Sequence, residues 1–248
     1  MLTALALDGL PEVRPGDDLA TLIADAAPSG LGDSDVVVVA HKVVSKSEGR
    51  IQALDEIAPS NRARELAAQL GKDSRHVQVV LDESREVLRA QRGVLICLTH
   101  HGFVCANAGV DASNVPGVDT VVMLPLDPDA SARALRARLH ELTGAAPAIL
   151  ITDSFGRAWR HGQVDVALGC AGLKPLEDWR GRLDANGREL RATWIAVGDQ
   201  LAAAADLARS KNSRQPVVVV RGAERFVSSD DGPGAAALIR PEEEDLFR

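Results

Sequence analysis

The order of apolar and polar residues along the chain predicts a protein built from both strands and helices. Unbroken apolar runs rich in β-branched residues predict buried strands, because a strand that is covered on both faces has no polar side. Strands are predicted at Leu2–Leu7, Val36–Ala40, Val77–Leu81, Val94–Leu98, Ala148–Ile151, Val164–Leu168, Thr193–Val197 and Pro216–Val220. Apolar residues spaced three and four apart predict helices at Leu19–Ala27, Ser60–Leu70 and Asp129–Thr143, and from Gly198 through Arg209. The elements do not follow a strict strand–helix–strand order, so the expected fold class is α/β in a mixed α+β form.

Two of the apolar runs lead towards acidic residues in similar surroundings. The run Val94–Leu98 leads into a segment of small residues that contains Asp111. The run Ala148–Ile151 is followed, after one residue, by Asp153. Further oxygen donors lie close by in the sequence: Asn114, Thr152 and Ser154. We interpret both as acids at the polar end of a buried strand, where open α/β sheets place ligands. Two such acids suit an oxygen-ligated divalent cation that carries a phosphate, although capping or turn aspartates are the alternative.

Composition narrows the class of protein. The chain has 248 residues, of which 46% are hydrophobic and 25% charged, which is ordinary for a soluble globular protein. The net charge of -7 argues against nucleic-acid binding, because such binding needs a basic face. No apolar run approaches the roughly 20 residues that span a bilayer, and the N-terminus does not resemble a signal peptide. The three cysteines fit reduced thiols, so we expect a cytoplasmic protein without membrane association.

Basic segments offer candidate sites for an anionic ligand. No P-loop is present, but Lys42 and Lys46 lie among serines in a polar segment that ends near Gly49. This segment is either a phosphate site or a solvated charged loop. Arg157 and Arg160, directly after Asp153, are either a clamp for a substrate carboxylate or phosphate, or surface ion-pair residues.

Two other groups of polar residues allow less specific interpretations. Cys97, His100, His101 and Cys105 lack the usual spacing of a zinc site, so the histidines are expected to be structural or to orient the carboxylate site. Asp199 and Gln200 stand at the expected start of a helix, where they would cap it or supply an oxygen ligand.

Several segments together resemble one known family. They read CANAGVDASN, ITDSFGRAWRHGQVDVALGCAGLKPL, VVSKSEGR and GDQLAAAADL, and the opening LPEVRPGDD and the closing EEEDLFR fit as well. On these motifs the chain resembles the coenzyme F420-0:L-glutamate ligases, the γ-glutamyl ligases of the deazaflavin pathway. The likeness covers essentially the whole chain.

The resemblance implies a fold, a reaction and partners. Residues 1–248 would form the ligase region, with two subdomains of uncertain boundary in an intertwined homodimer. The enzyme would use GTP to add L-glutamate to coenzyme F420-0 through an acyl phosphate, and then further γ-linked glutamates. It would need Mn2+ or Mg2+, two ions in all, and K+. In many actinobacterial relatives a nitroreductase-like domain follows, which this sequence lacks, so it would be a stand-alone enzyme or the ligase half of a longer one.

The resemblance also assigns roles to residues. GTP would contact Leu10, Pro11, Glu12, Val13, His41, Lys46 and Asn114. The metal ligands would be Asp111, Asp153, Ser154 and Gln200, and the catalytic residues Asp111, Asp153 and Lys46. Three positions depart from the family pattern: His41 stands where a serine is expected, Ser154 replaces threonine, and Gln200 replaces an acid. Glutamine keeps an oxygen ligand but removes a charge, which would weaken a second metal site.

Two rival functions remain open at the level of sequence. One is a metal-dependent phosphohydrolase, which would release phosphate without needing glutamate. The other is a non-catalytic relative that binds a nucleotide or a deazaflavin. The sequence leaves open the number of glutamates added, the preferred metal and the oxidised or dehydro form of the acceptor.

Overall fold

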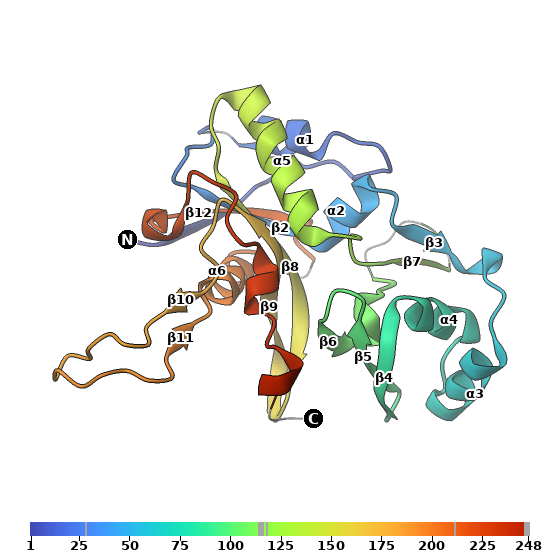
Figure 1. Cartoon of the computed structure of the whole chain (residues 1–248). Coiled ribbons are helices and arrows are strands. Elements are labelled where there is room, and N and C mark those ends of the chain that lie inside the picture. Colours follow the sequence, from blue (N-terminus) through green and yellow to red (C-terminus); the bar gives the residue numbers. More distant parts are fainter. Residues whose placement is uncertain (28, 114–116, 118, 211, 246–248) are drawn as a thin grey trace.

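A five-stranded sheet forms the centre of the fold in a computed structural model that describes residues 1–27, 29–113, 117, 119–210 and 212–245 (Figure 1). The strands lie in the order β1 (Thr3–Ala6), β12 (Val217–Arg221), β2 (Val36–Ala40), β8 (Ala148–Arg157) and β9 (Arg160–Ala171). β2 and β8 are parallel, and the other neighbours are antiparallel. The predicted strands that correspond to these elements are confirmed.

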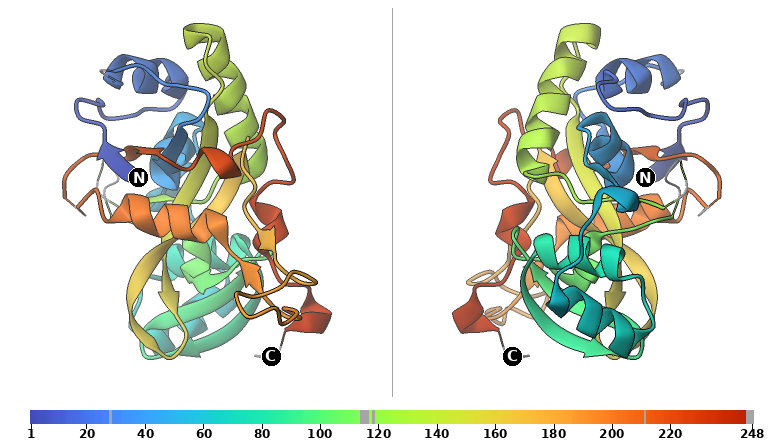
Figure 2. Two further views of the ribbon diagram at one scale, coloured as in Figure 1. Left: turned by 90° about the vertical axis from the view of Figure 1, so that its left-hand side faces the viewer. Right: turned by 90° about the vertical axis from the view of Figure 1, so that its right-hand side faces the viewer.

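Helices cover both faces of this sheet (Figure 2). α1 (Leu19–Ala26), α2 (His41–Ser47) and α5 (Pro128–Thr143) lie on one face, and α6 (Val197–Asp206) lies on the other. Alternate residues of β2 serve the two cores: Val37 and Val39 face α1 and α5, whereas Val36 and Val38 face α6. This double burial explains the unbroken valine run of β2.

The long helix α5 begins and ends where its sequence predicts. The Asp127 side chain accepts a hydrogen bond from the Ala130 backbone N–H, and Pro128 occupies the first turn. Gly144 ends the helix in the left-handed conformation, at φ 79°, which glycine adopts without strain.

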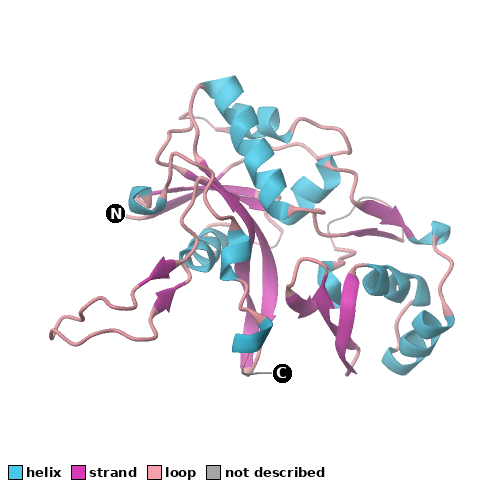
Figure 3. Cartoon of the chain, viewed as in Figure 1, coloured by secondary structure: helices cyan, strands magenta, loops and turns pink. Residues whose placement is uncertain are grey.

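A second group of elements packs beside the central sheet and has its own core. β4 (Ser84–Gln91), β5 (Val94–Thr99) and β6 (Val104–Ala106) form an antiparallel sheet against α3 (Asn61–Leu70) and α4 (Ser74–Asp82) (Figure 3). Two short ribbons complete the strands: β3 (Ile51–Ala53) with β7 (Thr120–Val122), and β10 (Glu177–Asp178) with β11 (Trp194–Ile195). The remaining short elements are 3-10 turns: η1 (Leu54–Glu56), η2 (Asn107–Gly109), η3 (Glu224–Phe226), η4 (Ala235–Leu238) and η5 (Glu242–Glu244).

Three predictions of local structure were wrong. The predicted strand Val77–Leu81 is part of helix α4, because Val77 and Val80, three residues apart, are buried together in the core shared with α3. The Asp73 side chain caps this helix by accepting from the Arg75 backbone N–H. Tertiary burial therefore overrides the strand preference of a valine-rich segment.

The polar segment after β2 is also helical rather than a loop. It forms α2, in which His41, Ser45 and Lys46 are buried, so this segment is no solvated charged surface. The predicted strand Thr193–Val197 shrinks to the two residues of β11, since α6 already begins at Val197. Among the described residues, no helix combines the length and apolar character needed to cross a bilayer.

Candidate active site

A cavity of about 1200 Å³ opens where β2 and β8 lose their apolar character. Five segments form its walls: the N-terminal loop, α2, the turn after β6, the β8–β9 pair, and the segment that follows α6. The polar residues of the lining include Glu12, His41, Lys42, Lys46, Asn107, Asp111, Ser113, Thr152, Asp153, Ser154, Gln163, Asp165, Asp206, Arg209, Arg214 and Gln215. The cavity thus contains both acidic and basic side chains. A negatively charged ligand that binds together with a cation requires both kinds.

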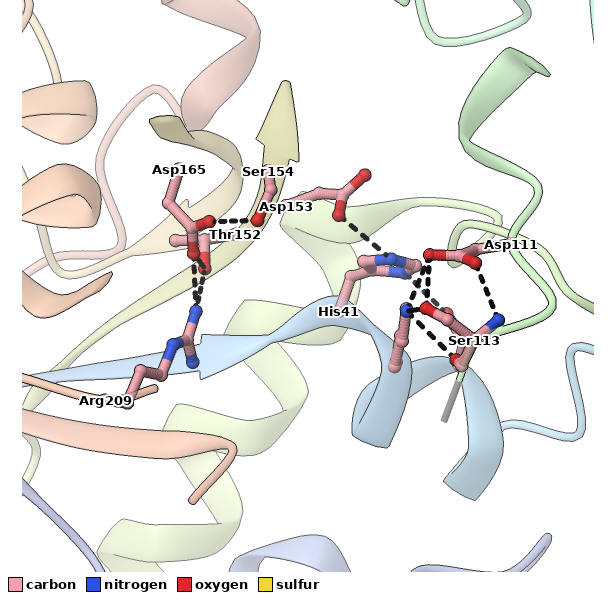
Figure 4. A network of polar contacts seen from close by, with 10 residues as sticks. His41, Asp111, Ser113, Thr152, Asp153, Ser154, Asp165 and Arg209 are labelled. Atoms are coloured by element: carbon pink, nitrogen blue, oxygen red, sulfur yellow. Dashed lines mark hydrogen bonds and ion pairs between the residues drawn. The ribbon is translucent and has the colours of Figure 1, made fainter. Parts of the chain in front are cut away.

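The parallel register of β2 and β8 brings His41 and Asp153 together. Ala40 pairs with Thr152 at the end of the β2–β8 ladder, so His41, the first residue of α2, lies beside Asp153, which continues β8. His41 Nε2 lies 3.4 Å from Asp153 Oδ1, and His41 Nδ1 lies 3.4 Å from Ser45 Oγ (Figure 4). Asp153 therefore reaches the cavity from the middle of β8, at the point where the burial of the strand ends.

The surroundings of Asp153 keep its carboxyl group charged. Burial raises its pKa, but His41, the Ser154 backbone N–H and Lys42 outweigh burial, and the net pKa lies below the ordinary 3.8. The side chain is still 21% exposed. A charged carboxylate that keeps open surface is available to an incoming cation.

Asp111 reaches the same cavity by a different route from the one predicted. It does not end the strand Val94–Thr99, because β6 and η2 intervene, and it pairs instead with Val122 in an isolated bridge. Lys42 Nζ donates to Asp111 Oδ2 at 2.7 Å, and the Ser113 backbone N–H donates to Asp111 Oδ1 at 2.7 Å. Burial raises the pKa of Asp111, but the hydrogen bonds and charge of Lys42 and the hydrogen bonds of Ser113 outweigh burial, so the net pKa is also below 3.8.

A strained turn lies between these elements. Asn107, Ala108 and Gly109 have φ values of 52°, 52° and 75°, a left-handed run that non-glycine residues rarely adopt. A Cβ at Gly109 would come within 2.6 Å of the Leu124 side chain, so this position needs glycine. Asn107 and Gly109 line the cavity, which agrees with the tendency of backbone strain to gather at functional sites.

The opposite face of β8 carries a second polar network, which sequence reasoning did not single out. Asp165 on β9 accepts hydrogen bonds from the hydroxyls of Thr152 and Ser154 and pairs with Arg209 (Figure 4). The available signal was weak: an acid between two valines in a strand, and an arginine just beyond an alanine-rich helix.

The segment predicted to hold GTP also lines the cavity. Leu10, Pro11, Glu12 and Val13 form one wall, and Lys46 Nζ lies 2.5 Å from Glu12 Oε1. Lys46 is buried on α2, one turn after Lys42. Asn114, the last residue predicted to contact GTP, lies outside the described residues.

Other sequence candidates lie away from this cavity. Gln200 is exposed on α6, and Arg157 and Arg160 are exposed at the turn between β8 and β9; none of the three belongs to the described lining. Asp199 does not cap its own helix but accepts from the Ala167 backbone N–H at 2.9 Å, which ties α6 to β9. Burial raises the pKa of Asp199, and that backbone hydrogen bond partly offsets the rise.

The histidine and cysteine cluster serves the fold. His100 Nε2 lies 3.0 Å from the Asp82 carbonyl oxygen, and His101 Nε2 lies 2.8 Å from that of Pro125. Cys97 and Cys105 face each other across β5 and β6 as buried free thiols. These contacts agree with the structural role, one of the two that were expected. Among the described residues, neither histidine forms a hydrogen bond or ion pair with Asp111 or Asp153.

Comparison with known proteins places this site in a family. Residues 9–222 match the family model described as F420-0:Gamma-glutamyl ligase. The chain is 46% identical to a coenzyme F420:L-glutamate ligase of Methanopyrus kandleri, with 100% of this chain and 99% of the relative covered. The chain belongs to the F420-0:γ-glutamyl ligase family.

Other members of this family show the same degree of likeness. A coenzyme F420:L-glutamate ligase of Methanothermobacter thermautotrophicus is 44% identical over 100% of this chain and 99% of the relative. One from Archaeoglobus fulgidus is 46% identical over 98% and 94%. The family resemblance seen in the sequence motifs is thereby confirmed.

The cavity has the donor chemistry for the divalent cation that the γ-glutamyl ligase family implies. Within the described part of the chain no three His, Cys, Asp or Glu side chains gather into a metal cluster, so the protein alone supplies few ligands. Asp111, Asp153 and Ser154 nevertheless offer oxygen donors to one cavity. Mg2+ and Mn2+ accept such oxygens and are commonly completed by water and by substrate phosphates, so these residues fit the group.

Proposed function

We propose that this protein joins L-glutamate to coenzyme F420-0 by an amide bond, at the expense of GTP. The observation that carries the proposal is the shared cavity: it unites the loop Leu10–Val13, the lysines of α2 and the carboxylates of Asp111 and Asp153 in a chain of this family. The names of the curated relatives support the substrate, coenzyme F420 with L-glutamate.

The proposed reaction has two steps. The terminal carboxylate of coenzyme F420-0 attacks the γ-phosphorus of GTP, which forms an acyl phosphate and releases GDP. The amine of L-glutamate then attacks the acyl carbon, the C–O bond to phosphate breaks, and the amide forms with loss of phosphate and a proton. The first step concentrates negative charge on the transferring phosphoryl group, so the site must supply positive charge.

The cationic side chains of α2 suit this requirement. Lys46 is buried beside Glu12, next to the loop assigned to GTP, so its charge is fixed rather than solvated. Lys42 holds Asp111 in place with a hydrogen bond of 2.7 Å. A fixed ammonium group stabilises developing charge without having to reorganise during the reaction.

Asp111 and Asp153 would hold a first divalent cation, and Ser154, on the other face of β8, would serve a second one. When bound, Mn2+ or Mg2+ would neutralise charge on the phosphate oxygens and orient them for transfer. His41 Nε2 lies 3.4 Å from Asp153 and keeps that carboxylate oriented at the cavity wall. We assign Gln200 no contact with this first cation, since it lies outside the described lining.

The remaining features of the proposal rest on the family resemblance. They are a second divalent cation, K+, the addition of further γ-linked glutamates, a homodimer, and a cytoplasmic location. Arg157 and Arg160 lie at the exposed tip of the β8–β9 hairpin, so within one chain they do not line the cavity.

The test is mass spectrometry of a reaction that contains the protein, coenzyme F420-0, L-glutamate, GTP and Mn2+, with each component omitted in turn. A product heavier by one or more glutamyl units, dependent on GTP and metal, would support the proposal and give the tail length. GTP hydrolysis that is indifferent to glutamate would instead indicate the phosphohydrolase. Ligand-induced stabilisation without turnover would indicate a binding-only relative.

A further inference from the structure

Asp165, a buried acid of the cavity wall, accepts hydrogen bonds from three side chains. Its Oδ1 accepts from Ser154 Oγ at 2.6 Å, and its Oδ2 accepts from Thr152 Oγ1 at 2.9 Å. Arg209 Nη2 donates to Oδ2 at 2.5 Å and to Thr152 Oγ1 at 3.2 Å. The cross-strand pairing explains the geometry, because Ser154 and Asp165 stand directly opposite each other in the β8–β9 ladder.

The cost of burying this acid makes its three partners informative. The Asp165 side chain is 1% exposed and that of Arg209 is 10% exposed. Burying an ion pair gives up much hydration, and well-packed apolar residues often serve stability as well or better. This pair stands in the wall of the cavity, beside Thr152 and Ser154, and not in the apolar cores of the sheet. Its position therefore points to a role in the site.

The direction of the hydrogen bonds determines what Ser154 offers to a ligand. A serine hydroxyl has one proton, and Ser154 donates it to Asp165. Towards any further group the oxygen can then act only as an acceptor. An oxygen of this kind suits a cation, whereas a phosphate needs a donor.

We propose that Asp165 is a positioning residue of the site: it accepts the hydrogen bond of the Ser154 hydroxyl and so presents the serine oxygen as a cation ligand, and it fixes Arg209 in the cavity wall. The inference rests on the proposed function, since it deepens the role of the same cavity. Asp165 acts through Ser154 and Arg209 and does not itself touch substrate. Asp153 differs in this respect, because it faces the cavity from the other side of β8.

The experiment measures binding of Mn2+ alone by isothermal titration calorimetry, with folding checked by circular dichroism. Asp165→Asn keeps the side-chain volume but loses the charged acceptor, and we expect Mn2+ affinity to fall about 10- to 100-fold, as for other residues that orient metal ligands. Ser154→Ala should lose a similar factor. The double variant Ser154→Ala/Asp165→Asn should bind no more weakly than Ser154→Ala, because Asp165 acts through the serine.

A matched control separates positioning from loss of a buried ion pair. Arg136 is 9% exposed and donates to Asp231 Oδ1 at 2.8 Å, away from the cavity lining. Asp231→Asn should leave Mn2+ affinity unchanged. If Asp165→Asn does not fold, the pair variant Asp165→Asn/Arg209→Gln removes both charges, and the same weakening of Mn2+ binding is expected from it.

The outcomes distinguish this inference from the proposed function. Unchanged Mn2+ affinity in a folded Asp165→Asn protein, with glutamyl transfer intact in the parent chain, would overturn the positioning role and leave the ligase standing. Additive losses in the double variant would overturn it as well. A parent chain that neither binds Mn2+ nor forms the heavier product would overturn both.

Discussion

Asp153 and Asp165 stand on neighbouring strands at one cavity, yet their surroundings differ. Asp153 is 21% exposed and lies 3.4 Å from His41, whereas Asp165 is 1% exposed and is bonded to two hydroxyls and a guanidinium. An acid that keeps open surface can take part in ligand binding. A buried acid that is bonded on both oxygens to its neighbours is placed to hold those neighbours in position. The difference shows that burial and hydrogen-bond partners, rather than residue type, decide what a carboxylate does in this site.

The largest expected effect comes from neutralising Asp153, the partly exposed acid. Asp153→Asn should reduce glutamyl transfer at least about a hundredfold, because even residues that only orient a metal ligand cost up to that factor. The unfolding midpoint should fall only slightly, since the amide keeps the shape of the side chain and loses only the stabilisation that the charge provides. Product formation by mass spectrometry and a thermal melt check both. Glu86→Gln, an exposed change on β4, is the control, and full activity in Asp153→Asn would refute the site assignment.

The buried acid, Asp165, should contribute more to the stability of the fold than Asp153 does. Asp165→Asn should lower the free energy of unfolding by about 3 kcal/mol, because it leaves the buried charge of Arg209 without its partner. Asp231→Asn should cost less, since Asp231 is half-exposed and Arg136 keeps the carbonyl oxygens of Ser228 and Ser229. Urea denaturation of the three proteins gives the comparison. Equal losses in both variants would remove the distinction between the two pairs.

A third prediction concerns the open side of the cavity. Lys46→Met should lower kcat/KM for GTP on the order of a hundredfold, because it removes a fixed positive charge beside the predicted nucleotide loop. Lys174→Met is the control, since Lys174 is an exposed lysine outside the described cavity lining. Steady-state kinetics with varied GTP measures the effect. An unchanged kcat/KM would mean that the nucleotide does not bind beside Lys46.

The smallest expected effect is a pH dependence of stability. The folded-state pKa of Asp153 is depressed below 3.8, so its charged form stabilises the fold above that pH, and the stabilisation is lost as the pH falls through the folded-state value. The difference in unfolding free energy between the parent chain and Asp153→Asn should be constant from about pH 8 to pH 5 and should shrink below pH 4. Urea denaturation across this range measures it. A difference that already shrinks near pH 6 would contradict the assigned direction.

Much of the fold could be predicted from the sequence, because the residue patterns that specify its strands and helices are local. The valine run of β2 and the capped, amphipathic α5 both lie where the residue pattern places them. The segment Val77–Leu81 was not accessible in this way. Its valines favour a strand by themselves, and only contact with α3 and the nearby sheet makes the helix the better state.

In the candidate site, too, some features follow from the sequence and others only from the tertiary structure. The sequence by itself determined that Asp111 and Asp153 are acids among oxygen donors, that Lys46 lies in a basic segment, and that the motifs belong to a ligase family. Only the tertiary structure decided that His41 meets Asp153, because their proximity comes from the parallel register of β2 and β8, two strands distant in the chain. It alone joined Asp165 to Arg209 as well. The sequence specifies which residues carry charge, but an ion pair between distant positions forms only once the fold has brought the two charges together and lowered their contact with water.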